Sequence, residues 1–170
     1  MAGAKQRGSG RGRVARYPLI SSFEDQVELK RWQVKDAAIS LVRDHATHGL
    51  NSAKVLLLPG KYPGLISDYF IGEWRGYQTF ACDIYLSGNT PLGLTIRIND
   101  NGHNQEYSDR YNHTFTLQPG PNHIDVPLLN VEKAPRTRRM DMEHITCMCL
   151  FSYNLKEHRC LCVDNFRLTK

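Results

Sequence analysis

Apolar and polar residues alternate along most of this chain, and a sustained helical period is rare. In segment 79–86, every second residue from Phe80 to Leu86 is apolar, whereas Asp83 and Tyr85 occupy positions between them. The same period of two recurs at 94–99, 114–117 and 124–128. Because successive side chains of a strand point to opposite faces, this pattern predicts β-strands with one buried side.

Clusters of turn-forming residues separate these segments, as at 87–91, 100–102 and 118–122. Period and composition predict further strands at 19–24, 32–35, 38–43, 51–58, 145–153 and 159–168. Helical turns are predicted only at 25–31 and 138–144. About ten strands in a body of about 150 residues predict an all-β fold, a two-sheet antiparallel β-sandwich.

The length of 170 residues and the 41% hydrophobic content fit one domain, which we expect to span residues 19–170. We expect residues 1–18 to form a disordered basic lead-in or linker. The first sixteen residues contain no apolar run, so they are not expected to be a secretory signal peptide. They carry five basic residues, which account for the formal charge of +5. Such a tail could bind nucleic acid or anionic lipid, but we favour a solubilising linker and expect no specific nucleic-acid partner.

The five cysteines are Cys82 and two C-x-C pairs, Cys147 with Cys149 and Cys160 with Cys162. If the two pairs lie on neighbouring strands, their thiols could form a metal site or a cross-strand disulfide. We favour the simpler interpretation that these residues are small buried hydrophobes.

Patterns typical of catalysis are missing from the sequence. The seven histidines follow no H-E-x-x-H or comparable spacing, and no glycine-rich loop joins a strand to a helix. We therefore expect a protein that is not an enzyme.

The order of motifs along the chain is similar to that of a known family. The motifs are Phe23-Glu24-Asp25, Trp32, His48-Gly49, Tyr62-Pro63-Gly64, Trp74-Arg75-Gly76-Tyr77, Leu94 to Asp100, Tyr107 to Asn112, Leu117 to Asn122 and Val163 to Leu168. Over residues 19–168 the chain resembles the galactose-binding-like jelly-roll domains found among carbohydrate-binding modules. It is notably similar to a bacterial version attached to VanZ-like membrane proteins.

The resemblance implies a structural calcium ion that ties the first strand to the last through carboxylates and carbonyls. Glu24, Asp25 and Asp164 occupy the corresponding positions. A simpler alternative is that Asp164 and Asn165 satisfy backbone donors at a bulge, because the apolar phase shifts there.

Strand phase and the resemblance together predict a ligand-binding groove. Its expected residues are Tyr85, Arg97, Asp100, Tyr107, Asp109, Arg110 and Tyr111. Tyrosine offers a stacking surface with a polar tip, and arginine offers charge-assisted hydrogen bonds. The alternative for Asp100, Asp109 and Arg110 is an internal ion pair that stabilises a turn. Trp32 and Trp74 are predicted to be core or loop anchors.

The resulting expectation is a non-catalytic module that binds a polysaccharide or glycan. The alternative is a protein–protein interaction or assembly domain of the same fold. The resemblance also implies a fragment of a larger membrane-attached or secreted protein, which favours an extracytoplasmic (periplasmic or cell-surface) location.

Overall fold

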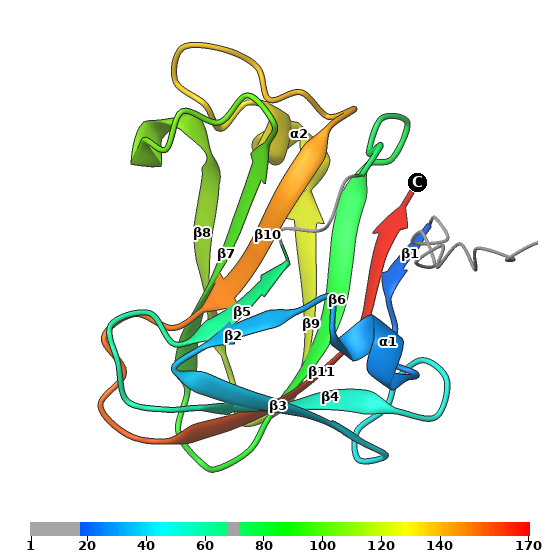
Figure 1. Cartoon of the computed structure of the whole chain (residues 1–170), viewed down its shortest axis with the longest axis vertical. Helices are drawn as coiled ribbons and strands as arrows, with labels where there is room; N and C mark the ends of the chain where they lie inside the picture. The colour runs from blue at the N-terminus through cyan, green and yellow to red at the C-terminus, as the bar shows by residue number, and fades with distance from the viewer. Residues whose placement is uncertain (1–17, 68–71) are drawn as a thin grey trace, which may run out of the picture.

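A computed structural model describes residues 18–67 and 72–170, so nearly all of the expected basic lead-in lies outside the described residues. The described chain folds into two antiparallel sheets, as predicted (Figure 1). Sheet A has the order β3 (Ala37–Val42), β4 (Ser52–Leu57), β11 (Arg159–Thr169), β6 (Thr79–Leu86) and β9 (Gly120–Pro127), with β1 (Leu19–Ser21) also paired to β11. Sheet B has the order β2 (Gln33–Lys35), β5 (Gly64–Ser67), β10 (Ile145–Phe151), β7 (Leu92–Asp100) and β8 (Tyr111–Leu117).

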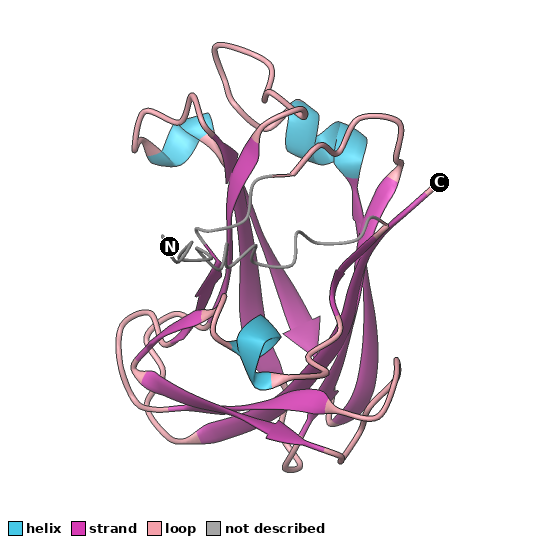
Figure 2. Ribbon diagram, turned by 45° about the vertical axis from the view of Figure 1, so that its right-hand side comes forward, coloured by secondary structure: helices cyan, strands magenta, loops and turns pink. Residues whose placement is uncertain are grey.

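Short helical segments occur only in the connections of the described chain (Figure 2). They are α1 (Gln26–Leu29), the 3₁₀ turn η1 (Tyr107–Asp109) and α2 (Leu128–Glu132). The predicted turn at 25–31 is confirmed by α1, which Asp25 caps through a hydrogen bond from the N–H of Glu28. The segment 138–144 contains no helix, but it includes a single turn in which the N–H of His144 donates to the carbonyl of Asp141 at 3.1 Å. None of the described helices has the length and apolar character needed to span a membrane.

The core lies between the sheets, where the apolar positions of the alternating strands meet. Phe80 of β6 stacks on Trp74 with ring centroids 5.9 Å apart. Phe166 of β11 meets the edges of both Phe80 and Trp32. Both tryptophans are buried, which confirms their prediction as core anchors.

Consecutive strands β6 and β7 belong to different sheets, and this overturns one sequence-based inference. The sequence analysis placed Tyr85 and Arg97 in one ligand-binding groove. The turn 87–91 instead carries the chain from sheet A to sheet B, so β6 pairs with β11 and β9 while β7 pairs with β10 and β8. Tyr85 and Arg97 therefore lie on opposite sheets.

The two C-x-C pairs are separated in the same way. Cys147 and Cys149 lie on β10 of sheet B, whereas Cys160 and Cys162 lie on β11 of sheet A. The alternative of a shared four-thiol site required the two pairs to lie on neighbouring strands, and they lie on different sheets. Burial of Cys82, Cys149 and Cys162 agrees with the simpler interpretation.

Candidate functional site

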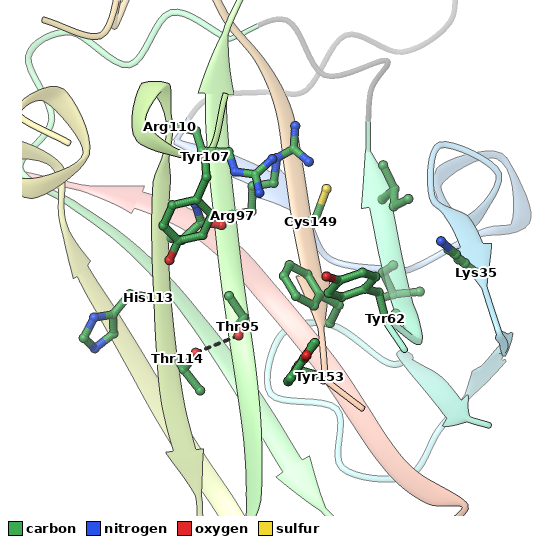
Figure 3. A pocket seen from close by; sticks show the side chains of 15 residues that line it. Lys35, Tyr62, Thr95, Arg97, Tyr107, Arg110, His113, Thr114, Cys149 and Tyr153 are labelled. Atoms are coloured by element: carbon green, nitrogen blue, oxygen red, sulfur yellow. Dashed lines mark hydrogen bonds between the residues drawn. The ribbon is translucent and has the colours of Figure 1, made fainter. Parts of the chain in front are cut away.

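A groove of about 750 Å³ runs over the outer face of sheet B. Its lining comes from strands β2, β5, β10, β7 and β8 and from loops beside them. The residues are Lys35, Tyr62, Gly64, Leu65, Ile66, Thr95, Arg97, Tyr107, Arg110, Asn112, His113, Thr114, Cys149, Phe151 and Tyr153. Figure 3 shows Arg97, Tyr107 and Arg110 near one end and Tyr62 and Tyr153 toward the other.

The register of sheet B aligns three polar side chains across the groove. Cys149 of β10 stands opposite Arg97 of β7, which in turn stands opposite Asn112 of β8. Residues directly opposite one another on antiparallel strands project to the same face. The Arg97 guanidinium donates to Asn99 Oδ1 at 3.2 Å and lies 3.4 Å from His103 Nε2. Neither of these two hydrogen-bond partners of Arg97 is acidic.

Arg110 enters the groove from the chain between η1 and β8. Its guanidinium lies over the ring of Tyr107, 5.2 Å from the centroid, in a cation–π contact. Burial and the nearby charge of Arg97 lower the pKa of Arg110. Arg110 Nε and Asn112 Nδ2 are buried and have no hydrogen-bond partner in the described part of the chain. Donors that are buried without a partner are costly, so these two atoms distinguish this end of the groove.

Aromatic rings form the other end of the groove. Tyr62 meets Phe151 with centroids 5.7 Å apart and Tyr153 with centroids 5.5 Å apart. Tyr62 is 40% exposed and Tyr153 is 64% exposed, so both rings present surface to solvent. Lys35 Nζ lies 5.8 Å from the Tyr62 centroid. Between the two ends, the hydroxyls of Thr95 and Thr114 are 2.7 Å apart (Figure 3).

The sequence analysis missed this aromatic end. It used Tyr62-Pro63-Gly64 only as a motif of the resemblance and did not predict β5, which begins at Gly64. A usable signal was present in segment 145–153, because Cys149, Phe151 and Tyr153 follow one another at every second position. That phase places Cys149 and Phe151 on the outer face of β10, opposite Arg97 and Thr95, and Tyr153 follows just after the strand.

Asp100 and Asp109 were predicted to contact ligand, but the structure places them in a buried ion-pair cluster with Arg138. The Arg138 guanidinium donates to both oxygens of Asp100 at 2.6 and 2.7 Å and to both oxygens of Asp109 at 2.7 and 2.9 Å. Neither aspartate lines the groove. The alternative of an internal ion pair was therefore the appropriate one for both aspartates, with Arg138 as their partner.

The electrostatics of this cluster follow from its geometry. Hydrogen bonds from Arg138 and the N–H of Asn104 hold the pKa of Asp109 well below its usual range. For Asp100, burial acts to raise the pKa, but Arg138 and the N–H of Asp141 outweigh it and lower the pKa. Both carboxylates therefore stay ionised and hold Arg138 between them.

The cluster also positions the groove. Asp109 ends η1 and directly precedes Arg110, and its carbonyl accepts a hydrogen bond from His103 Nδ1 at 3.0 Å. The other ring nitrogen of His103 faces Arg97. Asp109 thus links Arg138 to both arginines of the groove.

The two remaining predicted tyrosines lie away from the groove. Tyr111 belongs to the core, where burial raises its pKa to about 12. It pairs with Ile98 and shares the inward face of sheet B. Tyr85 lies on sheet A and stacks on His45, with centroids 3.4 Å apart. Of the seven predicted ligand-binding residues, the structure brings Arg97, Tyr107 and Arg110 together.

The three carboxylates of the expected calcium site have separate hydrogen-bonding roles. Glu24 accepts from the N–H groups of Leu50 and Asn51, whereas Asp25 caps α1. Asp164 accepts from the N–H groups of Thr47, His48 and Asn165. Burial raises the pKa of Asp164 despite these donors.

Glu24, Asp25 and Asp164 do not form a described group of three metal-ligating side chains whose ligand atoms lie within 4.8 Å of one another. Within the described ranges, the one group of three metal-ligating side chains with ligand atoms inside 4.8 Å of one another is Asp141, Glu143 and His144, which are exposed. The bulge interpretation of Asp164 and Asn165 is supported, because the register with β6 shifts after Asp164 and Asn165 has a φ of 56°. Glu24 and Asp164 nevertheless hold the same loop, residues 47–51, so calcium there stays a prediction.

No family model matches this chain, and no curated protein matches its sequence. Its structure is similar to that of an exo-β-agarase, with a TM-score of 0.72, 14% identity and coverage of 89% of this chain and 24% of the agarase chain. It is also similar to a family 11 carbohydrate-binding module from Clostridium thermocellum, with a TM-score of 0.67, 16% identity and coverage of 89% and 94%. A family 30 module from the same organism matches with a TM-score of 0.52, 14% identity and coverage of 78% and 82%.

At these identities the similarity concerns the fold. The chain spans about a quarter of the agarase and nearly all of the family 11 module. The described chain has the two-sheet jelly-roll sandwich fold of these carbohydrate-binding modules.

Proposed function

We propose that this protein binds carbohydrate in the groove of sheet B without catalysing a reaction on it. The observation that carries the proposal is that one groove contains both exposed aromatic rings and planar donors, two of which have no hydrogen-bond partner among the described residues. Sugars present apolar C–H faces that pack on aromatic rings, and their hydroxyls accept hydrogen bonds from guanidinium and amide groups. Tyr62 and Tyr153 supply the rings, and Arg97, Arg110 and Asn112 supply the donors.

The structural neighbours support the same proposal. The family 11 module was solved in complex with a β-1,3-1,4-mixed-linked tetrasaccharide, and a further neighbour is a family 30 carbohydrate-binding module. The described lining of the groove includes no Asp or Glu. Glycoside hydrolysis ordinarily uses two carboxyl groups that flank the scissile bond, so this lining favours binding over hydrolysis.

We also propose that the chain is the binding unit of a larger membrane-attached or secreted protein. This part rests on the sequence resemblance and on the agarase, of which the matched region is only about a quarter. In such a protein the module would concentrate its parent on a polysaccharide.

The proposal is tested by screening the protein against a glycan array and titrating the bound glycans by calorimetry. Tyr62→Ala should lower the affinity by about tenfold, because it removes a stacking surface. The melting temperature should change little, since the ring is half-exposed. Tyr85→Ala is the matched control, because it removes a tyrosine from the outer side of sheet A and should leave affinity unchanged.

Two results would contradict the proposal. The first is that no glycan binds to the wild-type protein. The second is that Tyr85→Ala weakens binding as much as Tyr62→Ala, which would place the site on sheet A.

A further inference from the structure

The groove contains positive charge with no described negative charge to balance it. Lys35, Arg97 and Arg110 line it, and its other described lining residues are uncharged apart from any protonation of His113. Figure 3 shows Arg97 and Arg110 close to Cys149, at the end away from Tyr153. A surface that only needed to be soluble would ordinarily mix both signs of charge.

Two arginines outside the groove, Arg75 and Arg138, have close acidic partners. Arg138 lies between Asp100 and Asp109, and Arg75 pairs with Glu73 at 2.6 Å and with Glu143 at 3.2 Å. The arginines of the groove differ. Arg97 contacts Asn99 and His103, and Arg110 stacks on Tyr107.

The polar end of the groove is also rich in donors and poor in acceptors. Arg110 Nε and Asn112 Nδ2 are buried without partners among the described residues, and a guanidinium can only donate. The hydroxyl of a neutral sugar must also donate its O–H, and this end of the groove offers few acceptors for it. A carboxylate or sulfate brings only acceptors, and its negative charge offsets part of the positive charge of the two adjacent guanidinium groups.

We infer that the groove binds an acidic glycan, with a carboxylate or sulfate group held between Arg97, Arg110 and Asn112. This inference rests on the proposed function, since it names the class of carbohydrate that the groove takes. The rings of Tyr62 and Tyr153 then hold a neighbouring sugar of the same chain. Lys35, beside Tyr62, favours a further negative group at that end.

The test uses pairs of glycans that differ only in charge. Calorimetry would compare an oligogalacturonate with its methyl ester, an oligomannuronate with its methyl ester, and a sulfated galactan oligosaccharide with its desulfated form. The uronate pairs and the sulfated pair distinguish carboxylate from sulfate as the recognised group. At least one charged member should bind about tenfold more tightly than its neutral partner, and its affinity should fall as salt is raised.

Variants assign this preference to the groove. Arg97→Gln and Arg110→Gln should each remove most of the charge preference, because the charged member loses a charge-assisted hydrogen bond whereas its neutral partner loses only an ordinary one. The affinity for the charged member should therefore fall several-fold more than the affinity for the neutral partner. Arg75→Gln is the matched control, because it removes an arginine outside the groove and should keep the preference intact. Circular dichroism of each variant should match that of the wild-type protein.

The outcomes separate the inference from the function on which it rests. Equal binding of charged and neutral partners, or binding of neutral glycans alone, would overturn the acidic-glycan inference and leave carbohydrate binding standing. Absence of binding to every glycan would overturn both. Tighter binding of a single-stranded oligonucleotide than of any glycan would assign the groove to nucleic acid and would also overturn the inference.

Discussion

Arg138 is the residue whose replacement should most clearly expose how this fold supports its groove. It is the shared partner of Asp100 and Asp109, to which it donates four hydrogen bonds no longer than 2.9 Å. Arg138→Met retains much of the aliphatic stem and removes the charge. The variant therefore leaves Asp100 in place with no cation to balance it.

The magnitude follows from burial. The side chain of Asp100 is 0% exposed, and breaking a buried ion pair by removing one partner costs about 3–5 kcal/mol. Arg138 is 30% exposed, so water screens part of the interaction, and the lower end, about 3 kcal/mol, is appropriate. For a domain of this size, each kcal/mol lowers the melting temperature by about 2–4 °C. We therefore expect Arg138→Met to melt about 6–12 °C below the wild-type protein.

Thermal melting followed by circular dichroism measures this difference directly. Arg139→Met is the matched control, because Arg139 is the next residue, is 60% exposed and reaches Glu132 only at 3.8 Å. Its free energy of unfolding should change by less than about 0.5 kcal/mol. Glycan affinity should also fall in Arg138→Met, because Asp109 fixes the turn that carries Tyr107 and precedes Arg110. If Arg138→Met melts within about 2 °C of Arg139→Met, the ion-pair cluster does not have the structural role assigned to it.

Three further predictions concern other parts of the fold. Because the pKa of Asp100 is lower in the folded protein than its unfolded value of about 3.9, Asp100 stabilises the fold above that pH, and this stabilisation is lost as the pH falls through the folded pKa. The free energy of unfolding, measured with denaturant, should therefore decrease more steeply below about pH 4 in the wild-type protein than in Arg138→Met. The same dependence on pH in both proteins would contradict this. Gly64→Ala should lower the melting temperature and distort the groove, because a Cβ there would collide with the main-chain carbonyl of Leu150. An unchanged melting temperature would show that β5 and β10 can move apart at little cost. If calcium binds near Asp164, the wild-type protein should melt at a higher temperature with calcium than with chelator, and Asp164→Asn should abolish this difference. Identical melting curves of the wild-type protein with calcium and with chelator would show that Asp164 only accepts hydrogen bonds from the backbone.

The sequence predicted the sandwich because burial of one face imposes a period of two on each strand. Segment 79–86 shows that period and forms β6 with the predicted bounds. The alternation within one strand does not show which other strand it pairs with in a sheet. Tyr85 and Arg97 have the expected outward phase, yet they lie on different sheets because the intervening turn crosses from one sheet to the other.

The candidate site was predictable only where local phase was sufficient. Arg97 could be placed on the outer face from the apolar residues that flank it in β7. The role of Asp109 depends on Arg138, which is 29 positions away and is brought near by tertiary packing alone. Tyr153 could have been predicted to lie on the same face as Cys149 and Phe151, because it continues their alternation within the predicted strand 145–153. The sequence analysis did not assign the residues of that strand to its two faces.

The central claim is that carbohydrate binds in the groove of sheet B, and chemical-shift mapping tests it most directly. The ¹⁵N-labelled protein would be titrated with the glycan that binds best on the array, and the perturbed amides would be placed on the structure. The account predicts that they cluster on β5, β10, β7 and β8, around Arg97 and Tyr62. A cluster on sheet A around Tyr85, with the amides of sheet B unchanged, would contradict it.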